Sequence, residues 1–336
     1  MTHFNEIQGN YLGFQGSADS GPPQMEVLRR SKLANLAAKR SARLTLDEHF
    51  RFWEGLQAET ADPLLPVRLV DTLIQRAWAP AYYAALCCSN LRVAIGRVAR
   101  YKRLVSPLVL DVAEVDEILS VRFDWPGASS APPASLVLAE QALIVTIARA
   151  GTRGRIRPRR LALPNPPRVV SGLEDYFGVP VESGSEAVLE FALADAVQPF
   201  TTSRDSSRTS ITPALVPPMD ELDGTDSVQS RVSAVLLQAL PSAQFQMLDV
   251  AKRLATSRRT LQRRLCSENT TFQRVLCRVR EALARHYLAH TALTCAEIAF
   301  LLGFEDPNSF FRAFHDWTGQ TPERMRSTLT AHSSLA

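Results

Sequence analysis

The sequence predicts an α+β domain followed by an all-α domain. Residues 25–202 mix short strand-like runs with longer helical stretches, a pattern typical of α+β domains. Residues 203–225 are rich in Ser, Thr, Pro and Asp without a sustained hydrophobic period, which predicts a linker. Residues 226–330 have helical periodicity throughout. Residues 1–24 are expected to be a flexible segment, and 336 residues suffice for two cores.

The first domain is expected to begin with helices and to continue with alternating strands and helices. Thr45 is a suitable N-cap for a helix that places Phe50 and Trp53 on one face. A Pro-rich break precedes a buried apolar helix from Ala134 to Arg149. The other expected elements are a helix over 91–104, a hairpin over 107–125, a strand over 160–167, a helix over 168–178 and a strand over 187–193.

The second domain is expected to hold seven helices joined by turns of a few residues. Asp226 or Ser227 can cap the first of them, which Pro241 ends. A long helix over 271–290 carries an apolar stripe on one face. The other helices are expected over 247–254, 257–268, 295–302 and 307–317, and from Pro322 onward.

Composition is that of a soluble globular protein, with 46% hydrophobic and 21% charged residues. The opening residues MTHFNEIQGN lack the basic and apolar regions of a secretory signal. The most apolar window is interrupted by Glu140 and Gln141 and is shorter than the about 20 residues that span a bilayer. We therefore expect a cytoplasmic protein that does not interact with a membrane.

No metal or cofactor is expected from the sequence. His286 and His290 lie four residues apart but lack the Glu of a metalloprotease motif. The five cysteines show no zinc-binding spacing and are expected to be reduced, mostly buried thiols: Cys87, Cys88, Cys266, Cys277 and Cys295.

Positive charge is concentrated near the C-terminus. Residues 228–336 hold 14 Lys and Arg against 8 Asp and Glu, whereas residues 1–227 hold 24 against 26. A surface that binds a polyanion is therefore expected in the second domain.

One pattern occurs twice in this basic domain, as DVAKRLATSRRTLQRRL and as EIAFLLGFEDPNSFFRAF. Each copy has a short helix, a tight turn and a second helix with a polar face, which Ser257 or Asp306 is placed to cap. A DNA-binding helix-turn-helix has this design, because its second helix exposes polar residues that reach base edges. The buried stripes expected on the second helices are Leu261 and Leu265, and Phe310, Phe314 and Trp317.

Residues 227–328 resemble the DNA-binding domain of the AraC family of transcription regulators, on the motifs SRRTLQRRL and AEIAFLLGFEDPNSFFRAFHDWTGQTPERMR. The resemblance implies that helix 271–290 holds two recognition helices in adjacent major-groove segments. It implies base contacts from Arg259, Gln262 and Arg263, and from Asn308, Phe311 and Arg312. Arg pairs bidentately with guanine, and Gln or Asn with adenine. Better assigned to phosphates or solvent are Lys252, Ser257, Arg258, Arg264, Arg274 and Arg278.

Three positions depart from the pattern of the family. Ala255 occupies a turn where glycine is common, and a left-handed conformation there costs roughly 1 to 2 kcal/mol. Asn269 replaces another usual glycine, but Asn tolerates that conformation. Phe311 stands where a small polar residue is frequent, and it either touches a thymine methyl group or covers a neighbouring helix.

Residues 25–202 resemble a sensor domain of the same family, one grouped by name with arabinose-binding regulators and not expected to be a cupin barrel. The most specific part is GLEDYFGVPVESGSEAVLEFALADAVQPF, supported by LPVRLVDTLIQRAW and RVARYKRLVSPLVLDV. The resemblance implies effector sensing, dimerisation or both, and it names no ligand. This region shows no Gly-rich phosphate loop, catalytic triad or paired carboxylates.

The sequence therefore predicts a regulator that binds double-stranded promoter DNA and acts with RNA polymerase. Control by a small-molecule effector or by homodimerisation is expected, and the resemblance implies an activator without enzymatic activity. One alternative is a dimeric regulator that needs no effector. Another is a metabolite-processing enzyme with a DNA-binding tail, which would need a Ser/His or Cys/His set. A non-specific packaging protein would need a larger positive excess.

Overall fold

The computed structural model describes residues 7–8, 24–32, 43–60, 62–75, 80–154, 156–204 and 227–333. The chain divides into two compact units, each described here by itself. The first comprises Met1–Arg76 and Asn90–Pro199, and the second comprises Ala77–Ser89 and Phe200–Ala336. Most of the flexible segment expected over 1–24 and most of the linker expected over 203–225 lie outside the described residues.

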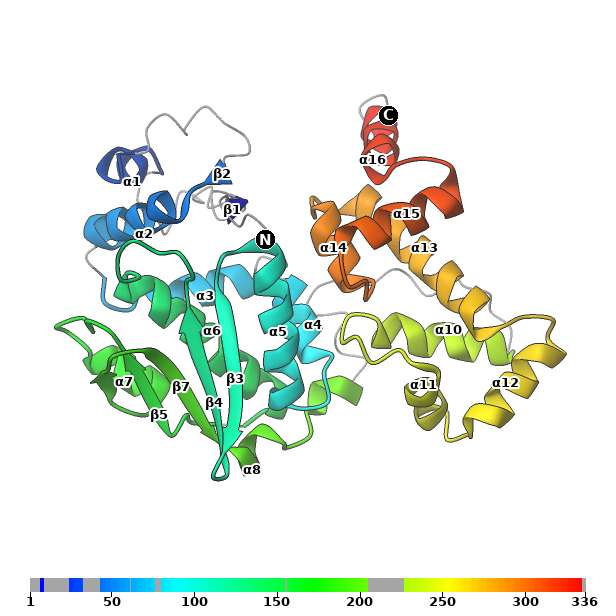
Figure 1. Cartoon of the computed structure of the whole chain (residues 1–336), viewed down its shortest axis with the longest axis horizontal. Helices are drawn as coiled ribbons and strands as arrows, with labels where there is room; N and C mark the ends of the chain where they lie inside the picture. Colours follow the sequence, from blue (N-terminus) through cyan, green and yellow to red (C-terminus); the bar gives the residue numbers. More distant parts are fainter. Residues whose placement is uncertain are drawn as a thin grey trace. The chain divides into compact units, whose positions relative to one another are not determined.

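The first unit combines helices with a five-stranded sheet, as predicted for an α+β domain (Figure 1). Thr45 caps the helix α2, because its hydroxyl accepts from the Glu48 amide while the Glu48 carboxylate accepts from the Thr45 amide. The helices of this unit are α1 (Gln24–Arg30), α2 (Leu46–Thr60), α3 (Leu65–Gln75), α5 (Leu91–Val105), α6 (Ala134–Thr152), α7 (Ser171–Phe177) and α8 (Leu193–Ala196).

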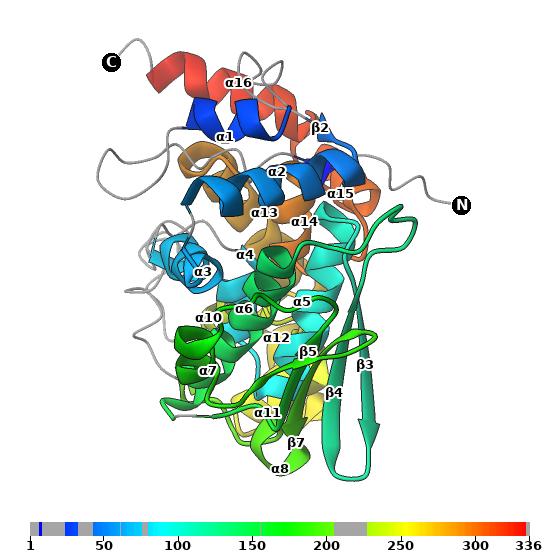
Figure 2. The same cartoon turned by 90° about the vertical axis from the view of Figure 1, so that its left-hand side faces the viewer.

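The strands of the sheet follow the order β3-β4-β7-β5-β6. The predicted hairpin is confirmed, with Val109 opposite Asp124 and Val115 opposite Ile118. Figure 2 shows β3 at one edge of the sheet, with α5 and α6 beside the sheet. The short strand β6, which pairs in parallel with β5, was not predicted. The five strands are β3 (Val109–Val115), β4 (Ile118–Asp124), β5 (Arg160–Leu163), β6 (Val181–Ser183) and β7 (Ala187–Ala192), and a separate two-stranded pair joins β1 (Ile7–Gln8) to β2 (Arg43–Leu44).

Side chains alternate between the two faces of the sheet. On β4 and β7, residues such as Val121 and Leu189 are fully buried. The opposite face carries charge, and Arg122 bonds Asp111 on the neighbouring strand at 2.6 Å. One face therefore packs against the core while the other is exposed.

The apolar helix α6 forms the centre of the first unit. Its residue Gln141 is fully buried, and its amide nitrogen donates to the carbonyl oxygens of Ala162 and Val188 at 3.1 Å each. These bonds join the helix to β5 and β7. By length and composition alone this helix is long enough to cross a membrane, contrary to expectation, but 72% of its most apolar stretch is buried inside the fold.

A buried ion pair joins α5 to α6. Lys102 Nζ lies 2.6 Å from the Glu140 carboxylate, and their side chains are only 5% and 10% exposed. His49 on α2 is also buried, and burial together with the positive charge of Lys102 lowers its pKa to about 4. His49 is therefore neutral at pH 7, so it places no positive charge beside Lys102.

The variant Lys102→Met is expected to lower the free energy of unfolding by about 3–5 kcal/mol, because it leaves the Glu140 carboxylate buried without its cation. Urea denaturation of the full chain measures this change. Combining it with Glu140→Gln should recover part of the loss. The control Arg122→Met breaks an exposed pair and should change stability little. Equal losses in both single variants would contradict the role of the buried pair.

The second unit is helical throughout its described residues (Figure 1). All seven predicted helices are present, and Ser227 caps the first by accepting from the Ser230 amide. A further helix, α4 (Pro80–Leu86), also lies in this unit, where the Thr202 hydroxyl bonds the Leu86 carbonyl at 2.9 Å. The predicted helices are α10 (Val228–Ala239), α11 (Met247–Arg253), α12 (Arg258–Ser267), α13 (Phe272–His290), α14 (Cys295–Leu301), α15 (Pro307–Thr318) and α16 (Pro322–Ser333).

Candidate nucleic-acid interface

The helices α11 and α12 form the first helix-turn-helix unit. Ala251 is 1% exposed, which allows the two helices to approach closely. The turn brings Ala255 to φ 49°, so the left-handed conformation considered from the sequence is confirmed, at a cost of roughly 1 to 2 kcal/mol. Ser257 then caps α12 by accepting from the Thr260 amide at 3.1 Å. The predicted start of the recognition helix is therefore correct.

The recognition helix α12 has one buried and one basic face. Leu261 and Leu265 are 1% and 0% exposed, as their spacing predicted. Among the described residues, none of the four arginines of α12 has an ion-pair partner. The positive charge of this face is therefore not compensated locally, which suits contact with an anionic polymer. The exposed residues of the face are Arg258, Arg259, Gln262, Arg263 and Arg264.

The helices α14 and α15 form the second helix-turn-helix unit. Thr294 and Glu297 make a capping box at the start of α14, and Asp306 caps α15 by accepting from the Ser309 amide at 2.9 Å. In the buried stripe of α15, Phe310 and Phe314 are fully buried. Trp317 is only half-buried, so the prediction that it is buried is wrong, because α15 ends one residue later and its ring lies at the edge of the cluster.

The polar face of α15 is narrower than that of α12. Asn308 and Arg312 are exposed, and Arg312 donates to the Ser309 hydroxyl at 3.3 Å. Phe311 is half-buried, with its ring 6.1 Å from that of Phe310. Part of the Phe311 ring is therefore reachable from solvent while the rest packs on its neighbour. A base contact by Phe311 stays a prediction.

The cap of α15 is expected to weaken in acid. Hydrogen bonds from Ser309 lower the pKa of Asp306 below its ordinary value of 3.8. A carboxyl whose pKa is lower in the folded state stabilises the fold above its unfolded pKa, and this contribution is lost as pH falls through the folded pKa. The variant Asp306→Asn keeps a good cap without titrating, so its stability should depend less on pH below about 4. Urea denaturation at several pH values measures the difference, and identical pH profiles would contradict it.

The long helix α13 carries the two remaining basic positions. Thr271 caps it by accepting from the Arg274 amide at 3.2 Å. Arg274 and Arg278 are exposed and lie four residues apart, on one face of the helix. Asn269 precedes α13 at φ 54°, the left-handed conformation that Asn tolerates. Lys252 on α11 is exposed as well.

One arginine of α13 faces inward and contacts the turn of the second helix-turn-helix unit and the segment that leads into the first. The Arg280 guanidinium donates to the carbonyls of Leu302 and Gly303, at 3.0 and 3.4 Å, in the turn after α14. It also lies between two rings, 4.8 Å from the centre of Phe245, before α11, and 4.4 Å from that of Phe304. Arg280 was not among the residues predicted from the sequence, because an arginine on a basic helix gives no sign that it is buried.

Gly303 completes this contact. Its φ of +74° is the left-handed conformation that glycine adopts readily, and a Cβ atom there would lie 2.3 Å from the Phe245 ring. The turn between α14 and α15 therefore requires glycine for two reasons: the left-handed backbone conformation and the close approach of the Phe245 ring. Phe245, in the segment before α11, and Gly303, in the turn between α14 and α15, are in direct contact as a result.

The variant Arg280→Ala is expected to lower the free energy of unfolding by roughly 1.5–3 kcal/mol, because the carbonyls lose charged hydrogen-bond donors. Arg280→Lys should recover little, since an ammonium cannot replace the planar guanidinium between two rings. Thermal or urea unfolding measures this loss. Arg285→Ala is the control on the same helix, because Arg285 is exposed and, among the described residues, pairs with Glu281 and the sulfur of Met325 alone. A similar loss in both variants would contradict the role of Arg280.

The cysteines are less buried than predicted. Cys87 and Cys88 are buried, but Cys266 is exposed and Cys277 and Cys295 are half-buried. Burial and the neighbouring carboxylate of Glu323 raise the pKa of the Cys295 thiol to about 12.

The two histidines of α13 lie side by side on the helix. His286 is half-buried, His290 is exposed, and their rings lie 4.8 Å apart. Within the described residues, no group of three or more His, Cys, Asp or Glu could hold a metal ion.

Two helix-turn-helix units on one long helix define a class of DNA-binding regulators. Residues 21–200 match the family model described as the arabinose-binding domain of AraC transcription regulators, and residues 250–328 match a helix-turn-helix domain model. The first match covers more than half of the chain. The protein belongs to the AraC family of transcription regulators.

Curated relatives match about a third of this chain. The ornithine utilization regulator of Pseudomonas aeruginosa is 39% identical over 105 residues, which are 31% of this chain and 31% of the relative. The transcriptional regulator VirS of Mycobacterium tuberculosis is 34% identical over 101 residues, 30% of each chain. This chain therefore matches about a third of the length of these relatives. The crystal structure of the regulator CdpR from Pseudomonas aeruginosa is 24% identical, with 90% of this chain and 98% of that chain covered at a TM-score of 0.37.

Proposed function

We propose that this protein binds promoter DNA in a sequence-specific manner through α12 and α15. The observation that carries the proposal is the pair of capped recognition helices, each exposing polar residues at its N-terminal end. The proposed base contacts are those of Arg259, Gln262 and Arg263 on α12, and of Asn308, Phe311 and Arg312 on α15.

The remaining basic and capping residues are proposed to position the protein on the phosphate backbone. All six are exposed, which a phosphate contact requires, and phosphate contacts set the register of a protein on the duplex without reading sequence. The six residues are Lys252, Ser257, Arg258, Arg264, Arg274 and Arg278.

The first unit is proposed to control DNA binding by sensing a small molecule, by homodimerisation, or by both. The match to a sensor domain model supports this proposal. We further propose a cytoplasmic activator that contacts RNA polymerase and has no enzymatic activity. A metabolite-processing enzyme with a DNA-binding tail is the second candidate, but no particular arrangement of side chains favours it.

Selection of the full chain on random double-stranded DNA tests sequence-specific binding. The expected result is one recovered motif with two half-sites. Binding to this motif should survive excess competitor DNA. Recovery of no preferred sequence would overturn the proposal and leave non-specific packaging as the explanation.

The variants Arg263→Ala and Arg312→Ala are expected to weaken binding to the selected site by about 1–3 kcal/mol each and to relax the preference at one position. Arg264→Ala should instead weaken binding to all sequences alike. It should also reduce the slope of log affinity against log salt concentration by about one unit. Fluorescence anisotropy at several salt concentrations measures both quantities. Arg285→Ala removes the same charge from an exposed position outside the recognition helices and should change neither. A uniform loss in all four variants would contradict the division between base and phosphate contacts.

A further inference from the structure

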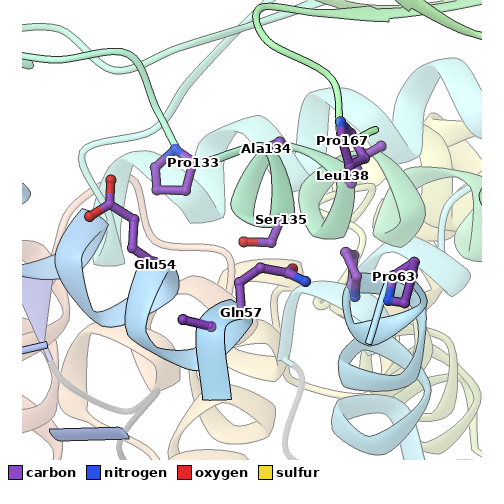
Figure 3. A pocket seen from close by; sticks show the side chains of 10 residues that line it. Glu54, Gln57, Pro63, Pro133, Ala134, Ser135, Leu138 and Pro167 are labelled. Carbon is purple, nitrogen blue, oxygen red and sulfur yellow. The ribbon is translucent and has the colours of Figure 1, made fainter. Parts of the chain in front are cut away.

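A cavity of about 370 Å³ lies in the first unit, between the helices α2, α3 and α6 and the loop after β5 (Figure 3). Its size falls in the range of pockets that hold small molecules, about 300–1,000 Å³. It is formed entirely within one compact unit. Its lining residues belong to four separate segments, which the fold brings together.

The walls of this cavity are apolar and stiff. Four prolines line it, Pro63, Pro66, Pro133 and Pro167, together with Leu138 and two alanines. Proline fixes its own backbone φ, so the loops that form the walls have few conformations available. A preformed apolar cavity binds apolar molecules without a large ordering cost. A sugar, in contrast, would leave most of its hydroxyl groups without partners against these walls.

Hydrogen-bond donors meet the cavity at the start of α6. The N-cap position is Pro133, which makes no side-chain cap, so the first amides of the helix have no capping acceptor. The first helical bond runs from the Val137 amide to the Pro133 carbonyl at 3.1 Å. The amides of residues 134–136 precede it and are available as donors. An acceptor oxygen placed here would be stabilised by these donors and by the helix dipole.

A buried hydroxyl lies at the same place. Ser135 is 5% exposed, and its side chain makes no hydrogen bond with any other described residue. Figure 3 shows the Ser135 hydroxyl pointing into the space between Gln57 and Pro133. This hydroxyl has no partner among the described residues, and an acceptor in the cavity would take its hydrogen bond.

The charges around the cavity disfavour an anion. No Lys, Arg or His is among the described residues that line it, and the exposed Glu54 contributes a negative charge at its rim. A carboxylate would therefore lose its hydration without gaining a cationic partner. An uncharged carbonyl oxygen can accept the same hydrogen bonds without this cost.

We propose that this cavity binds the effector, and that the effector is an uncharged, mainly apolar molecule whose carbonyl oxygen accepts from Ser135 and the first turn of α6. The inference rests on the proposed function of the first unit as a sensor. It departs from the sugar that the name of the matched family model suggests, because the cavity lacks the polar groups that a sugar requires.

A matched set of probes tests this chemistry on the full chain by isothermal titration calorimetry. Acetophenone has an aromatic ring and a neutral carbonyl, ethylbenzene lacks the carbonyl, and benzoate carries a negative charge. Acetophenone is expected to bind more tightly than ethylbenzene and benzoate, and L-arabinose is expected not to bind. Failure of acetophenone to bind, equal affinity for ethylbenzene, or tighter binding of L-arabinose would each overturn the proposal.

Two variants locate the binding. Ser135→Ala should weaken acetophenone about three- to tenfold, the effect of one lost hydrogen bond, and leave ethylbenzene unchanged. Ala58→Trp fills the cavity from an exposed position of α2 and should abolish acetophenone binding. Arg51→Trp makes the same substitution at an exposed position of α2 outside the lining and should bind normally. Unchanged binding in Ala58→Trp would overturn the location.

The DNA-binding proposal is tested separately. Anisotropy with the selected DNA site, measured without any probe, reports on α12 and α15 alone. A chain that binds its site but no probe would overturn the cavity proposal only. A chain that binds acetophenone but prefers no DNA sequence would overturn the DNA-binding proposal and leave the cavity assignment standing.

Discussion

The geometry of the DNA-binding unit depends on the contacts of one inward-facing guanidinium. Arg280 donates to two carbonyls in the turn of the second helix-turn-helix unit and stacks on Phe245, which lies two residues before the first. Burial lowers the pKa of Arg280, but an arginine is not deprotonated in proteins. One residue of α13 therefore joins the turn of the second helix-turn-helix unit to the segment that leads into the first, and a constant spacing of the two recognition helices lets both reach the same duplex.

The first unit depends on a different arrangement, in which polar groups are buried inside an apolar helix. Gln141 bonds two strands, and Glu140 pairs with Lys102 on α5, so α6 is joined to the sheet and to a neighbouring helix by directional bonds. Hydrophobic burial alone is not directional and would tolerate rotation of α6. With these bonds in place, the N-terminal end of the helix and Ser135 face the cavity in one orientation.

Local interactions made much of the candidate interface predictable. Ser257 and Asp306 were predicted as caps because a capping bond joins residues three apart, and the structure confirms both. The buried stripe of α12 follows from spacing alone. Trp317 was predicted to be buried and is not, since helical spacing identifies a face but does not show how far the neighbouring helices extend over it.

The sequence by itself determined the helices that follow residue 226 and the two capped recognition helices, because these features depend on residues close together in the chain. Only the tertiary structure decided which arginine is buried, where the unpredicted strand β6 pairs and where a cavity forms. Arg280, Phe245 and Gly303 lie far apart in sequence, as do Ser135, Gln57 and Pro167 around the cavity. Contacts of this kind arise from packing between distant segments, for which one chain carries no periodic signal.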